Sequence, residues 1–406
     1  MSKQAWGQAN WDVLTPGHRL VMLPGMKWPR MTIHTADGPV SAIAPVLLAV
    51  SRATDIPAFY MPWFMERLRA GYARWVNPFN GQPQYVSFER ARLAVFWSKN
   101  PAPLLGCLPG IREYGLTGYL QYTLNDYENE GWEPGLPPLR KRVETFRRLA
   151  DRLGPERMIW RFDPLLLAAA HGHDMLTPAV LLDRIAVIAK GLAGYTAKLV
   201  FSFADIAPYR KVEGNLRRNA IAWRDFTPEE MRQTGAAIAD ICASYGMRAA
   251  TCGEKADLSA QGVAHNRCTD PELVLKLAGR HPDVLDLLNL NGAEQLLLPG
   301  ASGAGERSYP RDPGQRPDCL CVPCKDIGQY NTCPHGCVYC YANTSEAVAR
   351  RNFRAHARGG ESIVPAGPTT VPTKRTAPIG PAVPATSTKM IAPTASAAPT
   401  KADSGS

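Results

Sequence analysis

An alternation of short apolar runs and longer helical stretches extends from Pro45 to Thr251, and it limits the fold more than any other feature of this sequence. The apolar runs, bounded by polar and often proline-containing turns, are Pro45–Val50, Leu93–Trp97, Gly118–Thr123, Met158–Phe162, Lys198–Phe203 and Met247–Thr251. The helical stretches between them include Tyr60–Ala70, Leu104–Tyr114, Leu139–Leu153, Ala179–Leu192 and Glu229–Tyr245. Strands that alternate with helices form βαβ units and pair in parallel, so we expect an α/β fold.

The number of these units favours a barrel. Six units are more than one half of a Rossmann fold contains, and they suit a full or partial (β/α) barrel. A doubly wound open sheet is the alternative. The last helical stretch begins Thr227-Pro228-Glu229-Glu230, where a threonine cap precedes a proline in the first turn.

Composition divides the chain into four parts. We expect an N-terminal extension over 1–40, a barrel-like α/β domain over 41–300 and a cysteine-cluster segment packed on the barrel over 301–358. Residues 366–406 are dominated by Pro, Ala, Thr and Ser without apolar periodicity, so they cannot bury enough surface to order themselves. This tail is predicted to be disordered.

Removal of the tail is expected to change little. Because residues after Ala366 lack any core-forming pattern, truncation there should leave metal content and thermal stability unchanged. Metal analysis and a thermal melt of the truncated protein check this. A large loss of either quantity would mean that the tail docks on the domain.

The composition also bears on location and partners. The N-terminus lacks the basic-then-apolar order of a signal peptide, and apolar stretches such as Ala42–Val50 are too short to span a bilayer. Clustered cysteines without an export signal favour metal ligands in a reducing cytosol over disulfides. We therefore expect a soluble, cytoplasmic protein with no membrane partner. The net charge of +10 suits an anionic partner such as a nucleic acid without requiring one.

Two groups of basic residues stand out. Arg350, Arg354 and Arg358 recur every four residues, so a helix there would carry a basic stripe. The second group is Arg140, Lys141, Arg142, Arg147, Arg148 and Arg152. Solvated helix faces are the favoured interpretation of both groups.

Polar side chains follow each apolar run, at the positions where barrel enzymes carry their catalytic groups. Each one alone is ordinary turn chemistry, as in Asn100-Pro101 and Asp163-Pro164. Together they favour an active-site mouth. The candidates for this mouth are Arg52, Asp55, Lys99, Asn125, Arg161, Asp163 and Glu254.

Six of the ten cysteines fall between Cys319 and Cys340, and the last three form a C-x3-C-x2-C loop of Cys333, Cys337 and Cys340. Three thiolates on a cubane iron–sulfur cluster leave the fourth iron without a protein ligand, so that iron can bind a small molecule. Gly336 permits a tight or left-handed backbone before the second cysteine. Tyr339, directly before the third, is placed to pack against a bound cofactor.

This loop resembles the motif of the radical S-adenosylmethionine (SAM) superfamily. The string from His335 to Ala342 is particularly similar to the cluster loop of spore photoproduct lyase and related DNA repair photolyase-like proteins. The resemblance implies a 4Fe–4S cluster on the three cysteines, SAM completing the coordination, and a reductant such as a flavodoxin or ferredoxin. It also makes a nucleic acid a candidate substrate.

The wider chain, from Ile33 to Asn343, resembles a bacterial family of unassigned function that carries a C-terminal cysteine cluster similar to that of radical SAM enzymes. The segments that carry this likeness are Ser51–Tyr60, Asn77–Asn80, Phe96–Pro101, Thr123–Tyr127, Trp160–Pro164, Lys198–Asp205, Gly314–Arg316, Asp326–Tyr330 and the cysteine loop. In radical SAM proteins the loop follows the first strand, whereas here it follows the whole barrel-like region. The resemblance therefore implies a circularly permuted arrangement in which the loop folds back over the barrel mouth.

Zinc is the alternative metal. Cys321-x2-Cys324 and Cys337-x2-Cys340 are separated by twelve residues, close to a four-cysteine zinc ribbon. That assignment leaves Cys319 and Cys333 unused, and the family resemblance implies a serine where Cys324 stands. We therefore favour iron–sulfur over zinc.

The remaining cysteines suggest a second site. Cys252 and Cys268 lie in segments that match the family pattern, and with Cys319 and Cys321 they could make a site of four thiolates. Buried thiols without a ligand are an equally good interpretation. Cys107 and Cys242 lie on helical stretches and are expected to be small buried hydrophobes.

The sequence thus predicts an iron–sulfur protein, and specifically a radical SAM-type enzyme whose substrate it does not name. The rival class is a non-catalytic metalloprotein, in which an iron–sulfur cluster or zinc staples the C-terminal segment onto the barrel.

Overall fold

The computed structural model describes residues 28–170, 172, 174–207, 209–290, 308–316 and 318–364. All of its elements lie in one compact unit, Met1–Thr369. Residues 1–27 of the expected N-terminal extension and the expected tail at 366–406 lie outside the described ranges.

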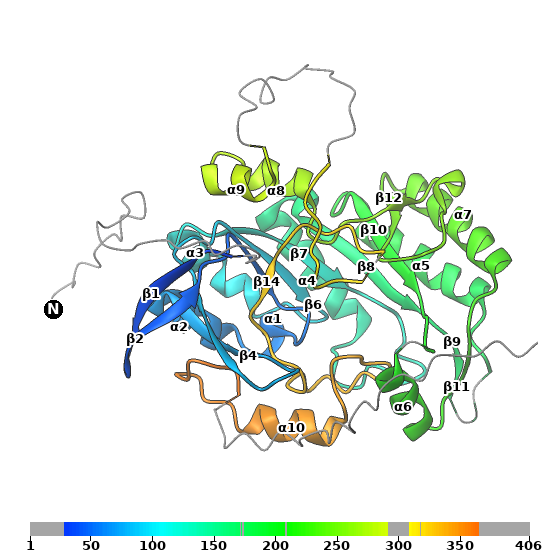
Figure 1. The fold of residues 1–406 in the computed structure, drawn as a ribbon. Helices are drawn as coiled ribbons and strands as arrows, with labels where there is room; N and C mark the ends of the chain where they lie inside the picture. Colours follow the sequence, from blue (N-terminus) through cyan, green and yellow to red (C-terminus); the bar gives the residue numbers. More distant parts are fainter. Residues whose placement is uncertain are drawn as a thin grey trace, which may run out of the picture. The chain divides into compact units, whose positions relative to one another are not determined.

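An eight-stranded sheet, parallel throughout, forms the centre of this unit (Figure 1). Its order is β13-β12-β10-β8-β7-β6-β3-β14. The strands are β3 (Leu47–Val50), β6 (Leu93–Ser98), β7 (Thr117–Thr123), β8 (Met158–Leu165), β10 (Lys198–Phe203), β12 (Arg248–Thr251), β13 (Ala264–His265) and β14 (Lys325–Asp326). The first six coincide with the six apolar runs, so the prediction of a parallel α/β fold is confirmed.

Five connecting helices match the expected stretches: α2 (Met61–Ala70), α3 (Leu104–Glu113), α4 (Leu139–Leu153), α5 (Pro178–Leu192) and α7 (Pro228–Ser244). Helices α1 (Ile56–Phe59) and α6 (Arg210–Arg218) correspond to no expected stretch. At the start of α7, Thr227 Oγ1 accepts a hydrogen bond from Glu230 N, and the Glu230 carboxylate accepts one from Thr227 N. This capping box satisfies two N–H groups that a helix start otherwise leaves unpaired.

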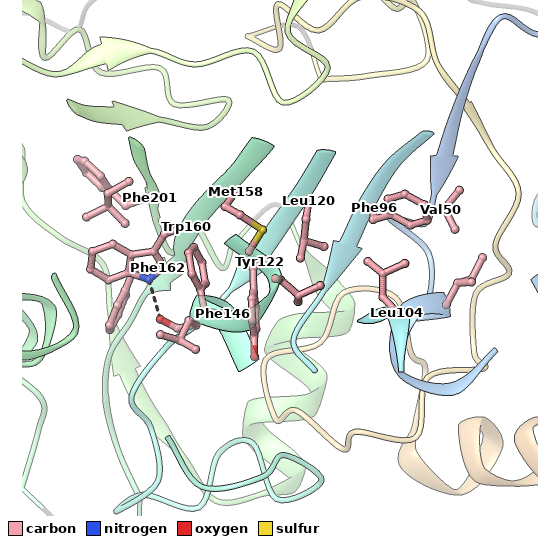
Figure 2. Close-up of a cluster of buried hydrophobic side chains, with 14 of the residues drawn as sticks. Val50, Phe96, Leu104, Leu120, Tyr122, Phe146, Met158, Trp160, Phe162 and Phe201 are labelled. Atoms are coloured by element: carbon pink, nitrogen blue, oxygen red, sulfur yellow. Dashed lines mark hydrogen bonds between the residues drawn. The ribbon is translucent and has the colours of Figure 1, made fainter. Parts of the chain in front are cut away.

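The two faces of the sheet have different covers, because successive side chains of a strand point to opposite faces. Leu48 and Val50 of β3 belong to the larger apolar cluster, which includes residues of α2, α3, α4, α5, α6 and α7. In Figure 2, Leu104 of α3 lies beside Phe96, and Phe146 of α4 lies against Tyr122. Leu47 and Ala49 face a second cluster, which includes residues of α8 (Pro271–Ala278) and α9 (Pro282–Leu287).

This arrangement is compatible with a partial barrel. The strand order runs in sequence from β3 to β13, and the crossover helices share one face, whereas a doubly wound sheet reverses its order at a switch point. In the described ranges no ladder joins β13 to β14, so a closed barrel is not formed. The sequence did not reveal β14, which pairs in parallel with β3 although it comes last in the chain.

Smaller elements complete the unit. A four-stranded sheet of order β1-β2-β5-β4 contains β1 (Arg30–Thr35), β2 (Gly38–Ile43), β4 (Tyr72–Val76) and β5 (Pro83–Ser87). Strands β9 (Leu167–Ala169) and β11 (Ala222–Arg224) pair antiparallel. Helix α10 (Glu346–Arg354) carries Arg350 and Arg354 of the expected basic stripe, and both are exposed. No helix within the described ranges is long and apolar enough to cross a lipid bilayer.

Candidate metal centre at the carboxyl edge of the sheet

The cysteine loop, residues 333–340, lies at the carboxyl edge of the sheet and is held there by hydrogen bonds to segments far away in the sequence. Before it, Thr332 O accepts from Tyr60 Oη at 2.7 Å. Within it, Val338 N donates to Trp132 O at 3.0 Å, and Cys340 O accepts from Asn215 Nδ2 at 2.8 Å. These bonds connect the loop to α1–α2, to the β7–α4 connection and to α6.

Two glycines make this docking sterically feasible. Gly336 has φ +74°, the left-handed conformation that the sequence predicted before Cys337. Gly135 lies against the loop, where its N–H donates to His335 O at 2.8 Å. A Cβ at Gly135 would stand 2.5 Å from that same oxygen, so a side chain there would push the loop off the domain.

The three thiols of the loop lie near one another. Burial raises the pKa of Cys337, the Lys99 charge opposes this, and Glu133 and the thiols of Cys340 and Cys333 raise it further. Burial also raises the pKa of Cys333 and Cys340. The metal-free loop therefore keeps its protons at neutral pH, and a bound metal would have to displace them.

Asp55 fixes the loop through His335. Its carboxylate accepts from His335 Nε2 at 2.8 Å, from Ser98 Oγ at 2.7 Å and from Lys99 N at 2.8 Å. It also caps α1 by accepting from Ala58 N at 3.0 Å. All four of these hydrogen bonds join the Asp55 carboxylate to other groups of the protein, so Asp55 is a positioning residue.

A second polar network surrounds Tyr339. Lys99 Nζ donates to Glu133 Oε1 at 2.6 Å and to Tyr339 Oη at 3.0 Å. Asn125 Nδ2 donates to Tyr339 Oη at 2.9 Å, and this hydroxyl donates to Glu133 Oε1. The structure therefore joins three predicted site residues, Lys99, Asn125 and Tyr339, through Glu133, which the sequence did not single out.

Arg142 corrects the expectation that the second basic group is a solvated helix face. Its side chain is only 1 % exposed, and Nη1 lies 3.7 Å from Glu133 Oε2 and donates to Asn125 O at 2.9 Å. The sequence held a signal for this: Arg142 lies four residues before Phe146 and seven before Leu149, on the buried face of α4.

Arg161 and Asp163 lie further along the same edge. Asp163 N donates to Asn125 Oδ1 at 2.9 Å, and its carboxylate accepts from Arg161 Nη2 and Ser202 Oγ. Arg161 Nη1 donates to Cys268 Sγ at 3.0 Å. These residues connect the Tyr339 network to the thiols of the predicted second site.

The other two candidates have different surroundings. Arg52 lies 3.8 Å from Asp326 and 3.9 Å from Asp312, and its Nη2 donates to Cys324 O at 3.4 Å. It thus pins the segment around β14 to β3. Glu254 is half-buried, and its carboxylate accepts from Lys255 N at 2.9 Å, so it is not one of the side chains that this network joins.

The cysteines fall into two groups. Cys337 neighbours Cys333 and Cys340, whereas Cys321 neighbours Cys268 and Cys319. Cys324 lies in the apolar cluster that contains Val322. The four cysteines of the zinc alternative are therefore divided between different places. Within the described ranges, no three Cys, His, Asp or Glu side chains are arranged to hold one metal ion.

The surroundings of the loop nevertheless fit a larger inorganic group. Beside the loop, Asn343 Oδ1 and Trp132 Nε1 are buried without a hydrogen-bond partner among the described residues, although buried polar atoms are nearly always paired. Lys99 supplies a positive charge beside Cys337, which suits an anionic cluster held by thiolates.

Fold and site together define a parallel α/β protein with a thiol-rich centre at the carboxyl edge of its sheet. The chain belongs to the family described as "Domain of unknown function (DUF1848)", which it matches over residues 47–342. No curated protein shows significant similarity to the chain.

Proposed function

We propose that Cys333, Cys337 and Cys340 hold a 4Fe–4S cluster whose open iron binds SAM, and that the protein is a radical SAM-type enzyme. One observation carries this proposal. The cysteine loop follows β14, and β14 pairs in parallel with β3, the first strand of the ordered series. In space the loop therefore follows the strand at the start of the series, as a permuted radical SAM barrel requires.

When bound, such a cluster supplies the electron for reductive cleavage of SAM, and this chemistry belongs to the cofactors. The electron comes from a reductant such as a flavodoxin or ferredoxin. The chain's own residues position the cysteine loop and balance the charge beside it. Asp55 orients His335 and with it the loop backbone, and Lys99 offsets negative charge beside Cys337. Asn125, with Lys99, fixes the Tyr339 hydroxyl directly before the third cysteine.

The first test of the proposal measures SAM binding to the reduced cluster, before any turnover is measured. Protein reconstituted anaerobically and reduced with dithionite should give a cubane EPR signal that changes when SAM is added, because SAM ligates the open iron. A colourless protein that holds zinc would contradict the proposal. A loaded, reduced cluster whose EPR signal does not change when SAM is added would also contradict it. Either result would support the non-catalytic metalloprotein.

A further inference from the structure

A second group of thiols, here called the second thiol group, consists of Cys252, Cys268, Cys319 and Cys321. Cys252 follows β12, Cys268 precedes α8, and the other two lie in the segment before β14. The fold brings these distant segments together. The sulfurs of Cys252 and Cys268 are 3.1 Å apart, Cys321 Sγ accepts from Cys268 N at 3.1 Å, and Cys319 lies two residues before Cys321 in the same segment.

Hydrogen-bond donors converge on the sulfurs of this group. Cys321 Sγ accepts a further hydrogen bond from Thr269 N at 3.4 Å. Cys268 Sγ accepts from Arg161 Nη1 at 3.0 Å and from Asn266 Nδ2 at 3.5 Å. Donors converging on sulfur are a recurring feature of iron–sulfur sites.

Cys242 of α7 shows what packing alone looks like. It is buried in the larger apolar cluster, and burial raises the pKa of its thiol to about 12. By contrast, the second thiol group has a buried arginine and two backbone N–H groups directed at its sulfurs. Arg161 already pairs with the Asp163 carboxylate, and its second guanidinium nitrogen is directed at Cys268, where its charge would offset that of metal-bound thiolates.

Zinc fits this group less well than iron. Zinc sites usually draw their cysteines from C-x2–4-C pairs, whereas this group combines Cys319-x-Cys321 with two cysteines from separate loops. The 3.1 Å between the sulfurs of Cys252 and Cys268 is a thiol–thiol contact, which would open when metal replaces the thiol protons.

We propose that Cys252, Cys268, Cys319 and Cys321 bind a second iron–sulfur cluster, closed by four thiolates, beside the buried guanidinium of Arg161. Four protein ligands leave no open iron, so this cluster stores or passes electrons and does not bind SAM. The hydrogen-bonded series Arg161–Asp163–Asn125–Tyr339 connects it to the cysteine loop. The proposal does not depend on the function proposed for that loop.

The two centres are separated by counting iron and sulfide in anaerobically reconstituted protein. The unaltered chain should hold about eight irons and about eight sulfides. The double variant Cys252→Ser/Cys268→Ser, which leaves only two thiolates in the second thiol group, should keep about half of each, with an EPR signal that still responds to SAM. The triple variant Cys333→Ala/Cys337→Ala/Cys340→Ala should keep the other half, with a cubane signal that ignores SAM. Cys324→Ser is the matched control and should keep the full load.

Other outcomes overturn the proposal. Full iron in Cys252→Ser/Cys268→Ser, or no metal in a folded triple variant, would leave the second thiol group as packing residues. One zinc and no iron in the triple variant would make it a zinc site. A disulfide between Cys252 and Cys268, detected by alkylation and mass spectrometry of the anaerobic protein, would make it a redox pair. If the double variant fails to fold, the triple variant decides alone.

Discussion

Replacement of any one of Cys333, Cys337 and Cys340 by Ala is expected to remove the open cubane cluster completely. In this assignment each of the three thiolates ligates one iron of the cubane, and two thiolates are too few to hold it. The SAM-responsive EPR signal should therefore vanish in each variant. If the second thiol group also binds a cluster, visible absorption should fall by about half, and otherwise to zero.

Cys324→Ser is the matched control for this series. Cys324 packs among apolar side chains, so its replacement should leave the SAM-responsive signal intact. The zinc alternative leads to the opposite ranking. Under it, Cys324 would be as sensitive as Cys337, and Cys333 would be dispensable. A series in which Cys333→Ala keeps its full metal load would therefore contradict the three-cysteine assignment.

Glu133→Gln is expected to destabilise the metal-free protein by about 3 kcal/mol, because it removes the buried carboxylate that pairs with half-buried Lys99 and with buried Arg142, which keeps only Glu128 among the described carboxylates. The Glu133 side chain is 4 % exposed and lies 2.6 Å from Lys99 Nζ and 3.7 Å from Arg142 Nη1. Urea unfolding followed by circular dichroism measures the difference. Glu144→Gln, an exposed change on α4, is the control and should alter stability by less than about 0.5 kcal/mol. Equal stability of the two variants would mean that the buried charges are not paired as the structure places them.

The stability difference at Glu133 should also depend on pH. Burial raises the pKa of Glu133, but the charges of Lys99 and Arg142 outweigh it and bring the pKa below its ordinary value of 4.5. A carboxyl with a lowered pKa stabilises the fold above its unfolded pKa, and this contribution is lost as pH falls through the folded value. The advantage of the unaltered protein over Glu133→Gln should therefore be constant from pH 7 to about 5 and shrink below 4.5. A difference that grows on acidification would contradict this pairing.

Local patterns in the sequence carried the prediction of the main sheet. Runs such as Lys198–Phe203 are apolar and bounded by turn residues, and they form strands because a parallel sheet buries both faces. Strand β14 is two residues long and contains Lys325 and Asp326, so no apolar run marks it. It forms because the chain returns to the open edge of β3, which is a long-range event that periodicity cannot register.

The site was predictable to the extent that its residues follow strands. Asp55, Lys99 and Asn125 come just after the carboxyl ends of β3, β6 and β7, where the parallel fold gathers side chains at one edge. Glu133 lies in the long β7–α4 connection, and nothing local distinguishes it from a solvated loop residue. His335 stands inside the cysteine loop, but its bond to Asp55 becomes visible only in three dimensions. Tertiary contacts, rather than spacing, define both roles.

The most direct test of the central claim is to measure the products of SAM cleavage. Reconstituted protein, reduced with dithionite under anaerobic conditions and supplied with SAM, should release 5′-deoxyadenosine and methionine in equal amounts, slowly in the absence of substrate. Cys337→Ala, treated identically, should release neither, and Cys324→Ser should match the unaltered protein. Liquid chromatography with mass spectrometry quantifies both products. A fully loaded, reducible cluster that yields neither product would contradict the enzymatic account and leave a structural or electron-transfer centre in its place.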